Sequence, residues 1–313
     1  MREMGKRKRQ WLQSPPIKSP TESARTNDAD ATPKEPYPSH PRPSPEECRS
    51  VRDDLLALHG FPQEFVKYRK LRPNSGDNGL PGDTVKSGPL EVEKDGGSSP
   101  KETVLDGLVS TVLSQNTTDS NSQRAFASLK SAFPVWEDVL ASESKCIENA
   151  IRCGGLAATK ASCIKNILCS LLEKKGKLCL EYLRDMSVNE VKAELSCFKG
   201  IGPKTVACVL MFHLQLDDFP VDTHVFQIAK AIGWVPEVAD RNKTYLHLNH
   251  RIPNELKFDL NCLLFTHGKL CRQCTAKGST QQRKESHESS CPLLNYCKRI
   301  SNSNELTIDG YSL

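Results

Sequence analysis

The chain of 313 residues is long enough to bury one large hydrophobic core or two smaller ones. Its 43 Lys and Arg against 38 Asp and Glu leave a net charge of +5, which permits binding to nucleic acid without requiring it. No apolar run approaches the ~18 residues that span a bilayer, so we expect no membrane partner.

The 13 cysteines are an odd number, and the N-terminus has no apolar signal segment. Several of them fall within helix-like apolar patterns. An intracellular, reducing compartment is therefore expected in place of a disulfide framework.

Residues 1–45 are rich in Pro, Ser, Thr and charge and are predicted to be a disordered tail. Within them the basic run Lys6–Arg9 indicates nuclear import. The alternatives are a plastid or mitochondrial transit segment and a merely solvated charged tail. Transit peptides are poor in acidic residues, which argues against that alternative here. We therefore predict the nucleus.

The chain changes character after the tail. Residues 46–71 begin after a proline with a one-sided apolar pattern and are predicted to be N-terminal helices that pack with the C-terminal lobe. Residues 72–101 are rich in Gly and Pro and have few apolar groups, so they are predicted to be a flexible insert.

Helical patterns fill residues 102–222, where we predict a six-helix domain. No period-two alternation indicates a sheet, and no fixed repeat indicates a solenoid, so the fold class is all-α. Residues 223–299 are predicted to be a C-terminal helical lobe, followed by a tail at 300–313. The expected helices before residue 185 cover 104–113, 120–133, 135–142, 144–152, 159–174 and 178–184.

A helical hairpin is predicted where Ser187 and Glu190 form a capping box for one helix. Gly200 and Gly202 are expected to reverse the chain with positive backbone angles, and Pro203 fits the first position of the next helix. Such a hairpin presents backbone amides to a phosphate without reading sequence. Gly200 and Gly202 are therefore candidate DNA-binding residues.

Lys204 lies in the first turn of that second helix, where the positive end of the dipole disfavours a cation. A neutral amine there is a competent nucleophile toward a sugar carbon, provided that an acidic partner is close. Asp222, in Phe-Pro-Val-Asp-Thr, is the candidate partner. The alternatives are a phosphate contact for Lys204 and a helix cap for Asp222.

Four cysteines near the C-terminus have the spacing C-x2-C-x16-C-x5-C and predict a metal site: Cys271, Cys274, Cys291 and Cys297. Spacing alone favours zinc, with unligated thiols as the alternative.

The string FKGIGPKTVACVLMF, followed by FPVDTHVF, resembles the helix-hairpin-helix and Gly-Pro-Asp (HhH-GPD) signature of the endonuclease III family of DNA glycosylases. The resemblance extends over roughly residues 102–299 and implies a two-lobed helical fold with a C-terminal loop that carries a four-cysteine cluster. It also implies that Lys204 attacks the anomeric carbon and that Asp222 assists. The family's 4Fe-4S cluster is implied as the cofactor, although the cysteine spacing matches the family's only in the final step; zinc is the alternative.

The segment LSQNTTD at 113–119 lies where the family places the side chain that fills the space left by an extruded base. Gln115 and Asn116 are the candidates, with a helix-capping role as the alternative for Asn116. Their order is closer to that of the plant DEMETER and ROS1 class of 5-methylcytosine glycosylases than to that of endonuclease III.

The predicted function is base-excision repair by a bifunctional DNA glycosylase and AP lyase that acts on modified, oxidised pyrimidines. The partner is duplex DNA with a damaged or modified base, bound across a cleft between the lobes, and the protein is expected to be monomeric. The alternatives are a 5-methylcytosine glycosylase and a non-catalytic DNA-binding protein with the same hairpin.

Overall fold

The computed structural model describes residues 34–72, 102–271, 273 and 291–297. Throughout these ranges the secondary structure is helical, with no strand, which confirms the predicted all-α class. The α-helices are α1 (Pro45–His59), α2 (Gln63–Lys70), α3 (Val104–Ser114), α4 (Asp119–Ala132), α5 (Trp136–Ala141), α6 (Ser144–Ala150), α7 (Ala157–Lys175), α8 (Val188–Ser196), α9 (Pro203–Cys208), α10 (Thr223–Ala231), α11 (Arg241–Arg251), α12 (Asn254–Leu270) and α13 (Leu294–Cys297).

Three short helical segments are of other kinds. The 3-10 helices are η1 (Arg152–Gly154) and η2 (Glu181–Asp185), and η3 (Val209–His213) is a π-helix. The helix predicted at 178–184 is therefore a short 3-10 turn that begins three residues later. The predicted tail at 300–313 and most of the 72–101 insert lie outside the described residues.

The first helix begins at a capping box, in which the Ser44 side chain accepts from the Glu47 amide and the Glu47 carboxylate accepts from the Ser44 amide. Arg42 holds the same carboxylate in an ion pair of 2.6 Å. Residues 35–44, which fall within the predicted disordered tail, lie against α11: Arg251 pairs with Glu35 at 2.5 Å. These contacts give the start of α1 a defined place on α11.

The first hydrophobic core draws all of its buried side chains from positions 104–214. Helix α3 is apolar on most of its surface, and its two central residues Leu108 and Val109 are fully buried. Helix α7 contributes Ile164 and Ile167 from one face. A helix that is apolar nearly all round must be covered on every side, which explains why α3 contacts α4, α7, α9 and η3.

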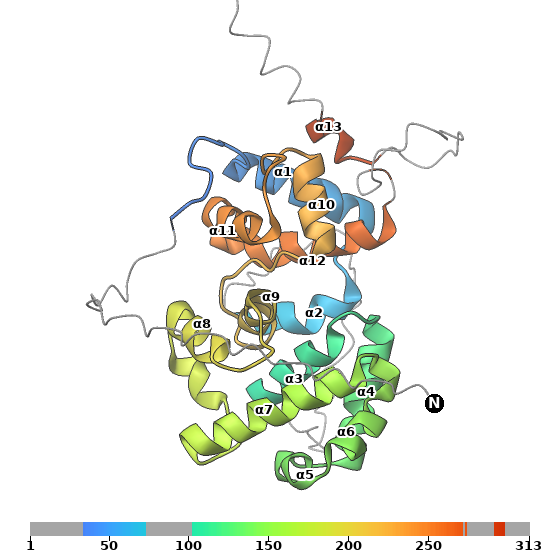
Figure 1. Cartoon of the computed structure of the whole chain (residues 1–313). Helices are drawn as coiled ribbons and strands as arrows, with labels where there is room; N and C mark the ends of the chain where they lie inside the picture. Colours follow the sequence, from blue (N-terminus) through green and yellow to red (C-terminus); the bar gives the residue numbers. More distant parts are fainter. Residues whose placement is uncertain (1–33, 73–101, 272, 274–290, 298–313) are drawn as a thin grey trace, which may run out of the picture. The chain divides into compact units, whose positions relative to one another are not determined.

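The second core combines α1 with helices from the other end of the chain, α10, α11, α12 and α13. Long-range packing of α1 on α12 joins them, and Figure 1 shows these five helices together, apart from α3 to α7. A smaller cluster of Met211, Phe258 and Cys262 is covered by aromatic side chains of α2 and η3. This cluster links the segment after the hairpin to α12.

The π-helix η3 ends at His213, which is only 9% exposed. Space for its ring exists because residue 107 is glycine: a Cβ there would lie 2.3 Å from the ring. Burial, together with the positive charges of Lys67 and Arg184, lowers the pKa of His213 to about 4. The ring is therefore neutral at neutral pH, and its 3.6 Å contact with Glu102 is not an ion pair.

Protonation of His213 should make the free energy of unfolding depend on pH. The pKa of His213 is about 4 in the folded state and has its ordinary value of 6.5 in the unfolded state. At a pH between these two values the unfolded state therefore binds more protons than the folded state. This contribution to the free energy of unfolding is fully present above pH 6.5 and is lost as the pH falls toward 4, by up to about 3 kcal/mol.

Urea unfolding of wild type and His213→Gln at about pH 7 and about pH 4.5 should show a smaller loss of free energy of unfolding in the variant. The exposed His250, replaced by Gln, is the matched control and should keep the wild-type loss. Equal losses in all three proteins would contradict the assignment.

Candidate nucleic-acid interface and metal site

The hairpin forms as predicted from its caps. Ser187 and Glu190 make the capping box of α8, and Pro203 is the first residue of α9. Gly200 has a φ of +93°, and a Cβ at this position would lie 2.8 Å from the Cys163 sulfur of α7. Gly202 has a φ of −97°, so the expectation of a positive angle there was wrong. A single left-handed residue is enough for the reversal because the Ile201 amide already closes a turn onto the Phe198 carbonyl.

Lys204 is exposed in the first turn of α9. The thiol of Cys208, one turn further along, is in the electrostatic range of both Lys204 and Asp222. Burial raises the pKa of the Cys208 thiol to about 11; the lysine opposes this shift, and the carboxylates of Asp222 and Asp218 add to it. Lys204 near the start of α9 and Asp222 at the start of α10 thus both influence the pKa of this one thiol.

Asp222 is the N-cap residue of α10, where its Oδ1 accepts from the Val225 amide at 2.8 Å. The capping role that the sequence left as an alternative is therefore present. It occupies one carboxylate oxygen, and a carboxylate has two, with about four lone-pair sites in all. The cap also fixes the orientation of the side chain relative to α10.

Asp218 anchors the segment that leads to Asp222, and its side chain is fully buried. The Tyr245 hydroxyl of α11 donates to both of its oxygens, at 3.0 and 2.9 Å, and Lys192 of α8 lies 3.3 Å away. The Phe219 amide donates to the same carboxylate. No sequence pattern distinguished Asp218 from its neighbour Asp217. In the structure the two differ in burial, since Asp217 is exposed and Asp218 is buried.

Three further hydrogen bonds hold this segment to the C-terminal helices. The Asn249 side chain of α11 accepts from the Phe219 amide at 2.9 Å and donates to its carbonyl at 3.1 Å. The Asn261 side chain of α12 donates to the Pro220 carbonyl at 2.7 Å. The amide and carbonyl of Phe219 and the carbonyl of Pro220 are thus satisfied by side chains, as burial requires.

Gln115 lies at the C-cap of α3 and is bonded to the hairpin helix: its Nε2 donates to the Thr205 hydroxyl at 3.0 Å. Thr205 is the residue after Lys204. Asn116 follows in an exposed, left-handed conformation with a φ of +51°, which asparagine tolerates better than most residues. The structure therefore places Gln115 beside the helix of the candidate nucleophile and leaves Asn116 at the surface.

Lys160 of α7 joins two loops from the buried side. The side chain is 2% exposed, and its Nζ donates to the Leu113 carbonyl at 2.7 Å and the Gly154 carbonyl at 2.9 Å. Burial lowers the pKa of Lys160. The loop that it holds carries Leu156, which is 55% exposed with a φ of +50°. Leu156 was not among the predicted site residues, because nothing in the local sequence marks a leucine as exposed on a strained backbone.

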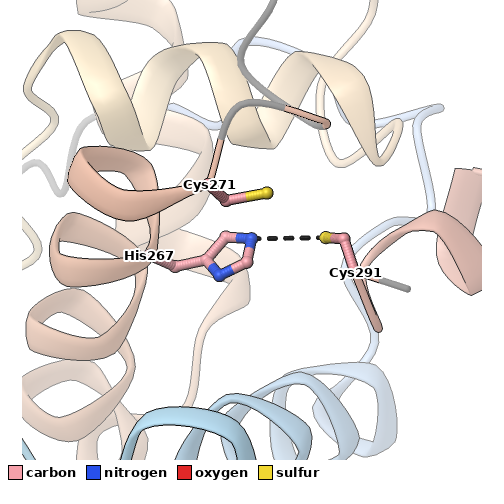
Figure 2. Close-up of side chains that lie close together, drawn as sticks. All are labelled: His267, Cys271 and Cys291. Carbon is pink, nitrogen blue, oxygen red and sulfur yellow. Dashed lines mark hydrogen bonds between the residues drawn. The ribbon is translucent and has the colours of Figure 1, made fainter. Parts of the chain in front are cut away.

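A candidate metal site lies where α12 ends (Figure 2). The ligand atoms of His267, Cys271 and Cys291 all lie within 4.8 Å of one another. His267 Nε2 is 3.3 Å from the Cys291 sulfur, and His267 Nδ1 is 2.9 Å from Nε2 of His59 in α1. This His/Cys group is suited to a metal ion or cluster.

Of the four predicted cysteine ligands, Cys271 and Cys291 belong to this group. The Cys297 thiol donates instead to the Ala231 carbonyl at 3.0 Å, and Cys274 lies outside the described residues. His267 was not among the ligands predicted from the sequence. Its signal is the spacing His-x3-Cys, which puts both side chains on one face of a helix.

The family model of the HhH-GPD superfamily of base excision DNA repair proteins matches residues 109–254. An Arabidopsis thaliana protein whose name assigns it provisionally to the DNA glycosylases is 62% identical over 264 residues, which cover 83% of this chain and 88% of the relative. The chain therefore belongs to the HhH-GPD superfamily and is a base-excision repair DNA glycosylase.

Two more distant likenesses agree with this assignment. The DNA glycosylase/AP lyase ROS1 of Arabidopsis thaliana is 35% identical over 118 residues, which cover 38% of this chain and only 8% of that protein. A solved non-covalent complex of endonuclease III with DNA has the same fold, with a TM-score of 0.57 at 20% identity over 84% of this chain and 99% of the other. The fold expected from the resemblance is thus confirmed.

No helix among the described ranges has both the length and the apolar character needed to cross a membrane.

Gly268 lets α12 approach α10 near Asp222. A Cβ at this glycine would lie 2.4 Å from the Cβ of His224, which no side-chain rotation relieves. Gly268→Ala should therefore lower the free energy of unfolding by about 1–3 kcal/mol, despite the better helix propensity of alanine. Gly202→Ala is the matched control, because no heavy atom lies within 4 Å of its added Cβ. Denaturant unfolding measures both; equal stability of the two variants would refute the close approach.

Proposed function

We propose that this glycosylase is bifunctional: it excises an oxidised pyrimidine from duplex DNA and then cleaves the strand as an AP lyase. The observation that supports the proposal is that Lys204 is exposed in the first turn of the hairpin helix, while Lys204 and Asp222, the N-cap of α10, both influence the pKa of the Cys208 thiol. An amine nucleophile with a nearby carboxylate is the arrangement that covalent attack on a sugar carbon needs.

In the proposed reaction the neutral amine of Lys204 attacks the anomeric carbon of the target nucleotide. The bond from this carbon to the base breaks, and the base leaves with the electron pair and takes up a proton. The Asp222 carboxylate stabilises the positive charge that develops on the sugar. Ring opening produces a Schiff base on Lys204, and removal of a C2′ proton then expels the 3′ phosphate by β-elimination.

The base must leave the duplex before the amine can reach the sugar. Gln115 and Asn116 are proposed to occupy the vacated position, because Gln115 is held next to Lys204 through Thr205. Leu156 offers an exposed apolar side chain on the loop that Lys160 ties to the same end of α3, which suits it to enter a base step as a wedge.

Phosphate contacts are proposed at the hairpin turn just before α9, where Gly200 is exposed and Gly202 partly exposed. Contacts of this kind position DNA without reading its sequence. Nuclear localisation, with plastid or mitochondrion as the alternatives, stays a prediction, since Lys6–Arg9 lies outside the described residues. The monomeric state also stays a prediction.

Borohydride reduction tests the nucleophile. It should trap wild-type protein covalently on a duplex with an abasic site, because reduction of the Schiff base makes the bond permanent. Lys204→Gln should lose the adduct completely while keeping its helical circular dichroism. Lys199→Gln is the matched control, since Lys199 is an exposed lysine of the same turn.

The control should form the adduct at the wild-type level. Trapping of Lys204→Gln at that level would refute the assignment, and absence of an adduct with wild type on every damaged or abasic duplex would support the non-catalytic alternative. That alternative predicts salt-sensitive binding without base release, unchanged by Asp222→Asn.

The substrate is tested separately with four duplexes that carry thymine glycol, 5-hydroxycytosine, 5-methylcytosine or an abasic site. We expect release of the two oxidised pyrimidines and strand cleavage at the abasic site. The alternative, excision of 5-methylcytosine, rests on the order of Gln115 and Asn116. Release of 5-methylcytosine without release of either oxidised base, measured by gel electrophoresis after alkali treatment, would favour it.

A further inference from the structure

The cofactor expected from the family resemblance is a cluster of several irons held by four thiolates, each on a different iron. The described residues at the end of α12 form a different donor set, one imidazole with two thiols. The third described cysteine of this region, Cys297, directs its thiol to the Ala231 carbonyl. Among the described residues, which leave out Cys274, the donor set therefore differs from the four thiolates of such a cluster.

Spacing separates a single ion from a cluster. Bonds of about 2.3 Å to sulfur and about 2.0 Å to nitrogen, at tetrahedral angles, leave the ligand atoms of one zinc about 3.5 Å apart. His267 Nε2 and the Cys291 sulfur are within hydrogen-bonding distance at 3.3 Å, which is also close to this value, and the Cys271 sulfur lies within 4.8 Å of both. Thiolates on different irons of one cluster lie farther apart, because the metal–metal edge separates them.

The other nitrogen of His267 is also occupied. Nδ1 lies 2.9 Å from Nε2 of His59, which is in the last turn of α1. A metal-binding histidine commonly gives its second ring N–H to a neighbouring acceptor, which fixes the ring and its tautomer. With a metal on Nε2, His267 Nδ1 carries the proton and donates it to His59 (Figure 2 shows Nε2 directed at Cys291).

We propose that His267, Cys271 and Cys291 bind one divalent zinc-type ion, and that His59 orients His267 for it. The site joins α12 to the segment that begins at Cys291, and through His59 it joins both to α1. This inference concerns the metal alone and stands or falls independently of the proposed catalysis.

Metal analysis of the full chain tests the proposal first. The protein should be produced with both iron and zinc supplied, purified without oxygen, and measured for zinc, iron and acid-labile sulfide. We expect about one zinc per chain and negligible sulfide. Iron and sulfide at about four per chain would overturn the proposal, and so would the absence of bound metal.

X-ray absorption at the zinc edge of the wild-type protein tests the ligands without any substitution. A first shell with nitrogen at about 2.0 Å and sulfur at about 2.3 Å is expected. A shell of sulfur alone would exclude His267 as a ligand and overturn the proposal, even if variants at this position fail to fold.

Substitutions then separate the roles. His267→Ala should lose zinc, whereas Cys297→Ser should keep about one zinc per chain; the reverse result would overturn the assignment. His59→Gln should weaken zinc binding by about 10–100-fold in competition with a chelator, as loss of an orienting partner does. His250→Gln, at an exposed histidine of α11, is the matched control and should bind zinc like wild type. An affinity of His59→Gln equal to that of the control would refute the role of His59.

Discussion

The buried carboxylate of Asp218 is the constraint on which the arrangement of the site depends. A fully buried charge is costly unless it is paired and hydrogen-bonded, and here the partners come from both sides: Lys192 belongs to a helix of the first core and Tyr245 to a helix of the second. Removing Lys192 would take away the paired positive charge, and removing Tyr245 would take away the hydroxyl that donates to both carboxylate oxygens. The need to satisfy one carboxylate thus holds the connection between the cores in place, and four residues later that connection delivers Asp222.

Buried groups also position the surface loops around the hairpin, and these groups belong to α7. Its Cys163 lies against Gly200, and its Lys160 is bonded to carbonyls at the end of α3 and in the turn before α7. A buried lysine amine has three donors to place, and carbonyls left free at helix ends and turns accept them. The loops that carry Gln115 and Leu156 are therefore fixed by groups that cannot themselves reach DNA.

In the second core the candidate metal site is likewise a group of polar side chains that joins segments distant in sequence. Helix α1 packs on α12, and the contact between His59 and His267 is the polar part of that packing. A histidine pair inside an apolar contact needs its nitrogens satisfied, and a metal ion on one side with a hydrogen bond on the other achieves this. Helix α12 thus supports both the segment that leads to Asp222, through Asn261, and the candidate metal site, through His267.

The sequence by itself determined the all-helical class, the capped hairpin and the lysine in the first turn of its second helix, because caps, glycine turns and apolar periodicity act over a few residues. Only the tertiary structure decided which polar residues are buried and which side chains meet. It separated Asp218 from Asp217, tied Gln115 to Thr205, and chose His267 over Cys297 as the neighbour of Cys291. Such choices depend on contacts between residues far apart in the chain, and no local pattern encodes them.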